Sequence, residues 1–173
     1  MSNSEKMRVC LKERVLPYLR SKGFKGVLPH LRRIDADGID LITFQFDKYG
    51  RPSFCVEYAF TAPFTPYELG PKFVVSEKNV KTSNFGLKNR LRLNPANAES
   101  KVPFDDYWFD FEQTSCSECA EKVIQALPIA EKWFLLNRDD QFHASKGTTK
   151  FVLRPPVYWF PTPRVWPRSQ DVD

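Results

Sequence analysis

Two cysteines three positions apart form the most chemistry-like pattern in the chain. Cys116-Ser117-Glu118-Cys119 lies where a helix is expected to begin, and the positive end of a helix dipole lowers the pKa of a nearby thiol. Cys116 and Cys119 could therefore form a redox pair. The alternative is a helix start that happens to contain two cysteines, and this alternative is favoured because the strands expected before it are antiparallel, unlike the βαβ surroundings of a thioredoxin-like motif.

Other residues with catalytic or metal-binding potential are few. A zinc site at the cysteine pair would need two further ligands. The remaining cysteines and histidines are Cys10, Cys55, His30 and His143. They form no second paired motif, and no phosphate-binding glycine loop is present. We therefore predict no metal site, no cofactor and no catalytic residues, and we lean towards a protein that is not an enzyme.

Positive charge is concentrated at the start of the chain. The net charge is +5, but residues 1–33 carry nine Lys and Arg against two Glu. A basic helix can bind nucleic acid. It can equally be the solvated side of an amphipathic helix, which is the favoured interpretation because the overall charge is modest and RNA-binding motifs are absent. Nucleic acid is a possible partner that the sequence does not favour.

The C-terminal segment differs in composition from the rest. Residues 151–167 contain five prolines and five aromatic residues, which excludes a helix and favours an extended conformation. Aromatic side chains at this density do not suit free solvent. We expect this segment to pack on its own domain or on a partner protein, and Tyr158, Trp159 and Trp166 are the candidate partner-binding residues because Tyr and Trp are common in interface hot spots.

A three-strand antiparallel meander is the clearest structural signal. Residues 39–46 and 53–60 alternate between apolar and polar side chains, with a turn between them, and the period of two predicts strands. Residues 27–34 supply an earlier, less regular strand. Gln45 and Glu57 lie opposite the aromatic side of the meander, and we expect solvent on their side of the sheet.

Two helices flank this meander. The first is expected over Ser4 to Lys22, capped by Ser4 and kinked at Pro17. The second begins near Ser115, where Ser115 and Glu118 have the spacing of a capping box. Pro128 interrupts its apolar stripe and predicts a kink or a break before the helix ends at residues 137–140. Short strands are expected near residues 73–75, 87–93 and 107–111.

These elements predict an α+β fold. We expect one twisted antiparallel β-sheet of about five strands, with an N-terminal helix and a kinked C-terminal helix on one face. Residues 1–140 form this single domain, and residues 141–173 form the extended proline- and aromatic-rich segment. No run of apolar residues is long enough to span a membrane, and no secretory signal is visible at the N-terminus. The expected location is the cytoplasm, with four reduced cysteines.

Three short motifs resemble a family of uncharacterised bacterial proteins, the domain-of-unknown-function family 4304. The motifs are LRSKGFK at residues 19–25, ITFQFDKYG at 42–50 and SFCVEY at 53–58. The resemblance spans about residues 7 to 136. It implies an α+β fold and no established activity, so it supplies no catalytic positions.

Function is predicted mainly from what the sequence lacks. Without a catalytic constellation, we predict a non-enzymatic protein-binding domain, with an immunity- or antitoxin-like role as the specific version. A nucleic-acid-binding protein that uses its basic N-terminal helix and a thiol redox protein that uses Cys116 and Cys119 are the alternatives. The sequence does not indicate the oligomeric state.

Overall fold

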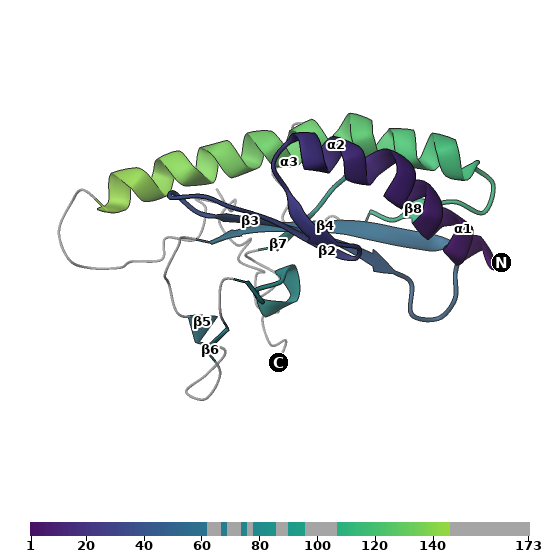
Figure 1. The fold of residues 1–173 in the computed structure, drawn as a ribbon, viewed down its shortest axis with the longest axis horizontal. Coiled ribbons are helices and arrows are strands. Elements are labelled where there is room, and N and C mark those ends of the chain that lie inside the picture. The colour runs from purple at the N-terminus through teal and green to yellow at the C-terminus, as the bar shows by residue number, and fades with distance from the viewer. Residues whose placement is uncertain (62–66, 69–73, 76–77, 86–89, 96–106, 146–173) are drawn as a thin grey trace, which may run out of the picture.

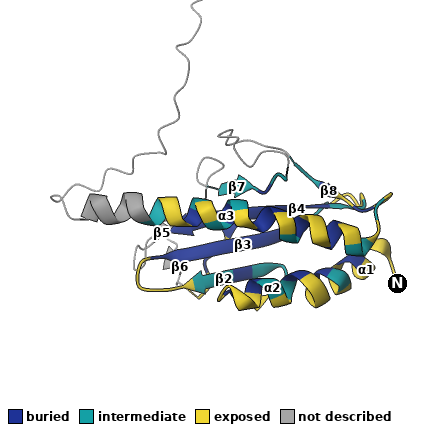
Figure 2. Cartoon of the chain, turned by 90° about the horizontal axis from the view of Figure 1, so that it is seen from above, coloured by how far each residue is buried: buried dark blue, intermediate teal, exposed yellow. Residues whose placement is uncertain are grey.

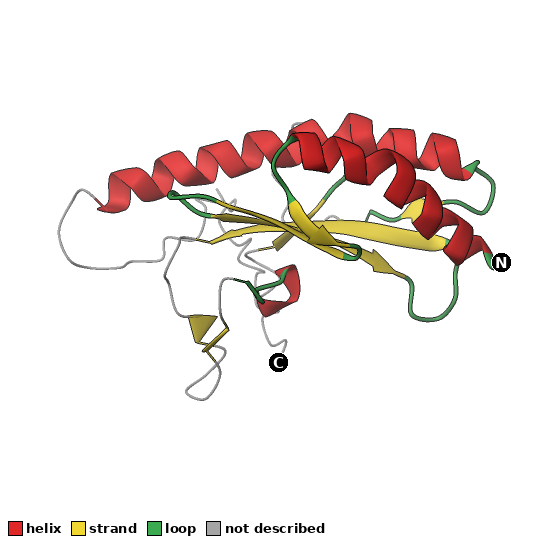
Figure 3. Ribbon diagram, in the orientation of Figure 1, coloured by secondary structure: helices red, strands yellow, loops and turns green. Residues whose placement is uncertain are grey.

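A twisted antiparallel sheet with helices across one of its faces forms the body of the chain (Figure 1). The structure is a computed structural model, and it describes residues 1–61, 67–68, 74–75, 78–85, 90–95 and 107–145. Helices and strands follow each other as Figure 3 shows, with the sheet below the two long helical segments. The predicted α+β fold with a sheet of about five strands is confirmed.

The N-terminal helical segment runs through α1 (Asn3–Cys10), the π-helical turn η1 (Leu11–Val15) and α2 (Leu16–Ser21). Ser2 caps it, because its hydroxyl accepts from the Glu5 N–H and the Glu5 carboxylate accepts from the Ser2 N–H at 2.6 Å. The prediction that Ser4 caps the helix is therefore wrong. The reciprocal bonds at Ser2 satisfy two backbone donors, which makes Ser2 the better cap.

The kink expected at Pro17 takes the form of the π-helical turn before it. Pro17 has no N–H to donate, and its ring crowds the preceding turn of an α-helix. The Leu16 N–H bonds to the Leu11 carbonyl, five residues back, so the turn is wider than an α-helical one. The helix then ends at Gly23, whose φ of 87° suits only glycine well, and the Phe24 N–H returns to the Leu19 carbonyl.

The main sheet contains β1 (Lys25–Val27), β2 (His30–Ile34), β3 (Ile39–Phe46), β4 (Ser53–Thr61), β7 (Arg90–Arg92) and β8 (Phe109–Asp110). Its order is β1-β2-β3-β4-β7, and β8 also pairs with β4. The single strand predicted over residues 27–34 is in fact two strands, because Leu28 and Pro29 form a tight turn between β1 and β2. Strands β5 (Tyr67–Glu68) and β6 (Val74–Val75) pair separately.

Both faces of the sheet are buried. On the helix face, Phe44, Phe54 and Val56 pack with Leu11 of η1 and Phe134 of the C-terminal helix in one apolar cluster. Figure 2 shows buried residues along β3 and β4 and exposed residues on the outer sides of the helices. This division follows from the alternation of side chains along each strand.

The opposite face, called the second face here, carries a smaller cluster of Ile39, Leu41 and Ala59, together with Val80 and Phe85. Residues 78–85, which include the short helix η2 (Thr82–Asn84), lie against it. Glu57 is 2% exposed, so the expectation that solvent covers its side of the sheet is wrong, although Gln45 is exposed.

The C-terminal helix α3 (Cys116–Ser145) is one unbroken element. Ser115 and Glu118 form the predicted capping box, with the Glu118 N–H donating to Ser115 Oγ at 3.2 Å. Of the two alternatives at Pro128, a break into two segments does not occur, and the helix continues beyond Asp140. Pro128 lies on the exposed side, where water can bond to the carbonyl that lost its partner.

The predicted domain boundary at residue 140 and the C-terminal segment are not tested by these elements. Residues 146–173, which contain Tyr158, Trp159 and Trp166, lie outside the described residues. Their packing on the domain or on a partner stays a prediction.

An ion-pair network fastens α3 to β2 and β3. Asp40, which is fully buried, accepts from Arg33 at 2.6 Å and from Arg138 at 2.8 Å. Arg33 also reaches Glu131 at 2.9 Å, and Arg138 reaches Asp35 at 2.6 Å. The network joins residues almost a hundred positions apart, so it fixes where α3 lies on the sheet.

The pKa shifts show that this network carries a desolvation cost. Burial raises the pKa of Asp40, and the two arginines only partly offset that effect. Burial also lowers the pKa of Arg33, but Glu131 and Asp40 together raise it above its ordinary value. We expect a buried pair of this kind to add little net stability while it is intact, and to cost several kcal/mol when one partner is removed.

Replacement of Arg33 by Met is expected to lower the free energy of unfolding by about 3 kcal/mol, because Asp40 then remains buried with one fewer partner. Replacement of the neighbouring Arg32 by Met serves as the control and should change stability by less than about 1 kcal/mol. Urea denaturation followed by circular dichroism measures both values. Equal losses in the two variants would contradict the assignment of Arg33 to the structural network.

Candidate functional site

Two adjacent arginines on β2 point to opposite faces of the sheet. Arg33 pairs across the strands with Asp40 on the helix face, whereas Arg32 pairs with Leu41 on the second face. Because side chains alternate along a strand, this separation is required by the strand itself. Arg33 is fully engaged in the ion-pair network, while Arg32 is half-buried and has no ionic partner among the described residues.

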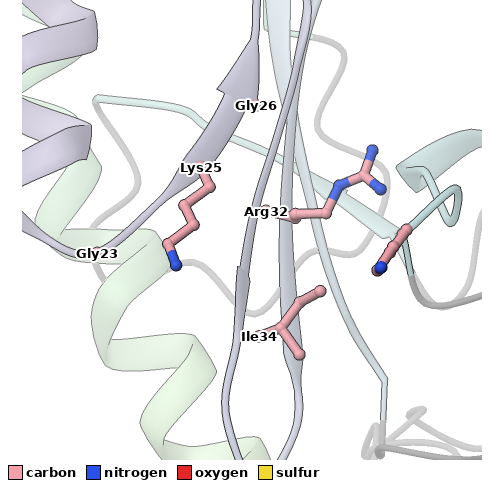
Figure 4. Close-up of a pocket in the computed structure, with 6 residues that line it drawn as sticks. Gly23, Lys25, Gly26, Arg32 and Ile34 are labelled. Carbon is pink, nitrogen blue, oxygen red and sulfur yellow. The ribbon is translucent and has the colours of Figure 1, made fainter.

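Arg32 lines a hollow of about 400 Å³ at the β1 end of the sheet (Figure 4). We call this the basic hollow. Its lining residues are Gly23, Lys25, Gly26, Arg32, Ile34 and Lys78. Three of these six residues are cations and none is an anion. In Figure 4 the side chains of Lys25 and Arg32 extend to opposite sides of the strand pair, so the positive charge is spread around the edge of the sheet.

Positive charge predominates among the described residues around the hollow. Burial lowers the pKa of Arg32, and no carboxylate of the described part of the chain raises it again. Burial also lowers the pKa of His30, two residues earlier on β2, and the charges of Lys81 and Arg32 lower it further. A half-buried cation without a counter-ion is costly. The basic hollow therefore favours the binding of a negatively charged group.

A polar row crosses the second face beside the hollow. The strand register aligns His30 with Thr43, Thr43 with Glu57, and Glu57 with Arg92. His30 Nδ1 and Thr43 Oγ1 share a hydrogen bond of 3.1 Å. Glu57 lies 3.5 Å from Arg92 Nε and 3.5 Å from an Arg90 nitrogen. Glu57 thus compensates the arginines of β7, and the cations at the β1 end have no equivalent carboxylate among the described residues.

The cysteine pair predicted as a redox candidate lies at the start of α3. Cys116 is its first residue and is half-buried, and Cys119 is 1% exposed. Burial raises the pKa of Cys119 to about 11, with smaller contributions from Cys116 and Cys10. A thiol of this pKa forms almost no thiolate at neutral pH, which opposes a role as nucleophile.

Sequence reasoning missed two features of these sites. Cys10 of α1 lies close enough to the pair for the charge of Cys116 to contribute to the raised pKa of Cys10. The basic hollow combines residues from β1, β2 and the segment before η2, and no local motif could have indicated it. The available signals were the excess of positive charge in residues 1–33, which we assigned to the first helix, and the excess in residues 72–101, which we considered only as a nucleic-acid surface.

No group of three or more His, Cys, Asp or Glu side chains among the described residues could hold a metal ion. None of the helices in this part of the chain is long and apolar enough to cross a membrane.

An antiparallel sheet with helices on one face defines the class as a small α+β domain. The family comparison adds no activity. The chain belongs to the family "Domain of unknown function (DUF4304)", whose model matches residues 15–136. Comparison with curated proteins and with solved structures found no match to the chain.

The rate of alkylation is expected to differ between Cys116 and Cys119. Iodoacetamide at neutral pH should modify Cys116 slowly and leave Cys119 unmodified until the protein unfolds, because Cys119 is buried and its pKa is about 11. Mass spectrometry of tryptic peptides measures both rates, with Cys116→Ser as the matched control. Rapid modification of Cys116 in the native protein would instead support the redox alternative.

Proposed function

We propose that the protein is a non-enzymatic binding domain that recognises an acidic surface of another protein through the basic hollow. The observation that carries this proposal is the half-buried Arg32, which lines the hollow together with Lys25 and Lys78 and without a carboxylate among the lining residues. An acidic group from a partner would supply the missing counter-ion. The contrast with Arg33, which shares its strand but is fully paired, supports a role for Arg32 outside the fold.

The surroundings of the hollow favour a protein partner over nucleic acid. Val27 is 75% exposed and Ile34 is 45% exposed, so apolar surface adjoins the cations. No aromatic ring lines the hollow on which a base could stack. The basic residues of α1 do not extend the hollow, and Arg8 packs over the Phe46 ring at 3.9 Å.

The specific immunity- or antitoxin-like role and the cytoplasmic location belong to the same proposal. Both are consistent with four free cysteines, all of which lie among the described residues. The immunity- or antitoxin-like version requires a partner protein that carries an acidic segment.

Fluorescence anisotropy with a short labelled peptide in which Glu alternates with Thr tests the proposal. The protein should bind this peptide at low salt, and Arg32→Glu combined with Lys78→Glu should weaken binding at least about tenfold, because both changes place negative charge in the hollow. The matched control combines Lys6→Glu with Lys12→Glu, which changes the net charge equally on the exposed side of the N-terminal helical segment.

Equal weakening in the control variant would contradict the assignment of the site. Failure of the wild-type protein to bind the peptide even at low salt would contradict the proposed function. Tighter binding of labelled oligothymidylate than of the peptide would favour nucleic acid as the partner and also contradict it.

A further inference from the structure

Among the strands that the structure describes, β1 is the outer strand of the sheet, and an arginine side chain occupies its outer edge. The strand order places β1 at one end, and all three of its residues are exposed. Arg20 of α2 donates to the Phe24 carbonyl at 2.8 Å and also to the Gly26 carbonyl. These carbonyls are two residues apart, which is the spacing of the acceptors that an edge strand offers to a neighbour. The guanidinium therefore takes the place of the N–H groups of an adjacent strand.

The central residue of β1 is glycine, which has no side chain of its own to cover the backbone of this edge. Gly26 has a φ of 107°, and a Cβ there would lie 2.7 Å from the His30 carbonyl oxygen of β2. The position therefore requires glycine, and only displacement of Arg20 is needed to expose the Gly26 carbonyl. Gly23 and Gly26 both line the basic hollow, so the outer edge and the hollow form one continuous surface.

We propose that the acidic segment of the partner binds as an additional β-strand along β1. This inference rests on the proposed function and specifies how the partner binds. The incoming strand takes over the Phe24 and Gly26 carbonyls from Arg20. Its alternating carboxylates project from one face of the strand and meet Arg32 and Lys78 on the second face. Main-chain pairing supplies affinity in this mode of recognition, and the alternating side chains supply specificity.

Charge at the edge favours an acidic partner segment over a second copy of the chain. Arg20, Lys25, Arg32 and Lys78 are all cations, and pairing of two β1 edges would bring two such sets together. Like charges placed opposite each other on neighbouring strands are unfavourable, and charged side chains on an edge are a known means to prevent self-association. The carboxylates of an acidic strand would instead be attracted to these cations.

Backbone N-methylation of the Glu-Thr peptide tests the strand pairing. Only one edge of an added strand pairs with β1, and the N–H groups of every second residue lie on that edge. N-methylation of those residues should weaken binding at least about tenfold. N-methylation of the other residues should change it less than about twofold. Hydrogen–deuterium exchange at the Gly26 amide should also slow when the unmodified peptide binds, because an added strand shields the backbone of β1 from water.

Two results would overturn the inference in distinguishable ways. If both methylated peptides bind as well as the parent and exchange at Gly26 is unchanged, the partner is held by side chains alone, and the proposed function still stands. If the parent peptide does not bind, both the pairing mode and the proposed function fail.

Discussion

The antiparallel pairing of β3 with β4 is the constraint on which the rest of the structure depends. It runs without interruption from Ile39 opposite Thr61 to Phe46 opposite Phe54. Because both faces are buried, this register decides at once which side chains meet the helices and which meet residues 78–85. A slip of β3 by one residue would move Phe44 to the second face, and a slip of β4 by one residue would move Glu57 into the aromatic cluster. The pairing is therefore strongly specified by packing on two sides.

The same alternation gives the neighbouring arginines of β2 different roles. Arg33 enters the network around Asp40, which joins α3 to the sheet, and its guanidinium lies 4.7 Å from the Phe24 ring. Arg32 reaches the second face, where positive charge from Lys78 adjoins it. Arg33 is thus paired within the fold, and Arg32 is the arginine that we propose to bind an external anion. This division links the architecture of the sheet to the proposed binding of an acidic partner.

The sequence predicts the parts of this fold that local patterns control. The period of two in residues 39–46 and 53–60 locates β3 and β4 almost to the residue, and the Ser115–Glu118 spacing locates the start of α3. The family assignment also follows from short motifs within these elements. These features depend on contacts between residues close in the chain, or on strands joined by a short turn.

Features that depend on distant segments could not be predicted in this way. The burial of Glu57 requires residues 78–85 to lie over the second face, and nothing in its own strand indicates that cover. The basic hollow and the Arg20 contact with β1 likewise combine residues whose side chains meet only after folding. Burial of polar groups by a separate segment is a tertiary effect that no periodicity encodes.

The proposed binding of an acidic segment at the basic hollow is tested most directly by a two-dimensional NMR titration of the isotope-labelled protein with the acidic peptide. The account predicts that amide signals of residues 23–34 and 78–81 shift progressively with peptide concentration, while those of the exposed side of α1 and of α3 stay in place. Shifts confined to α1, or spread evenly over all basic residues of the chain, would contradict it.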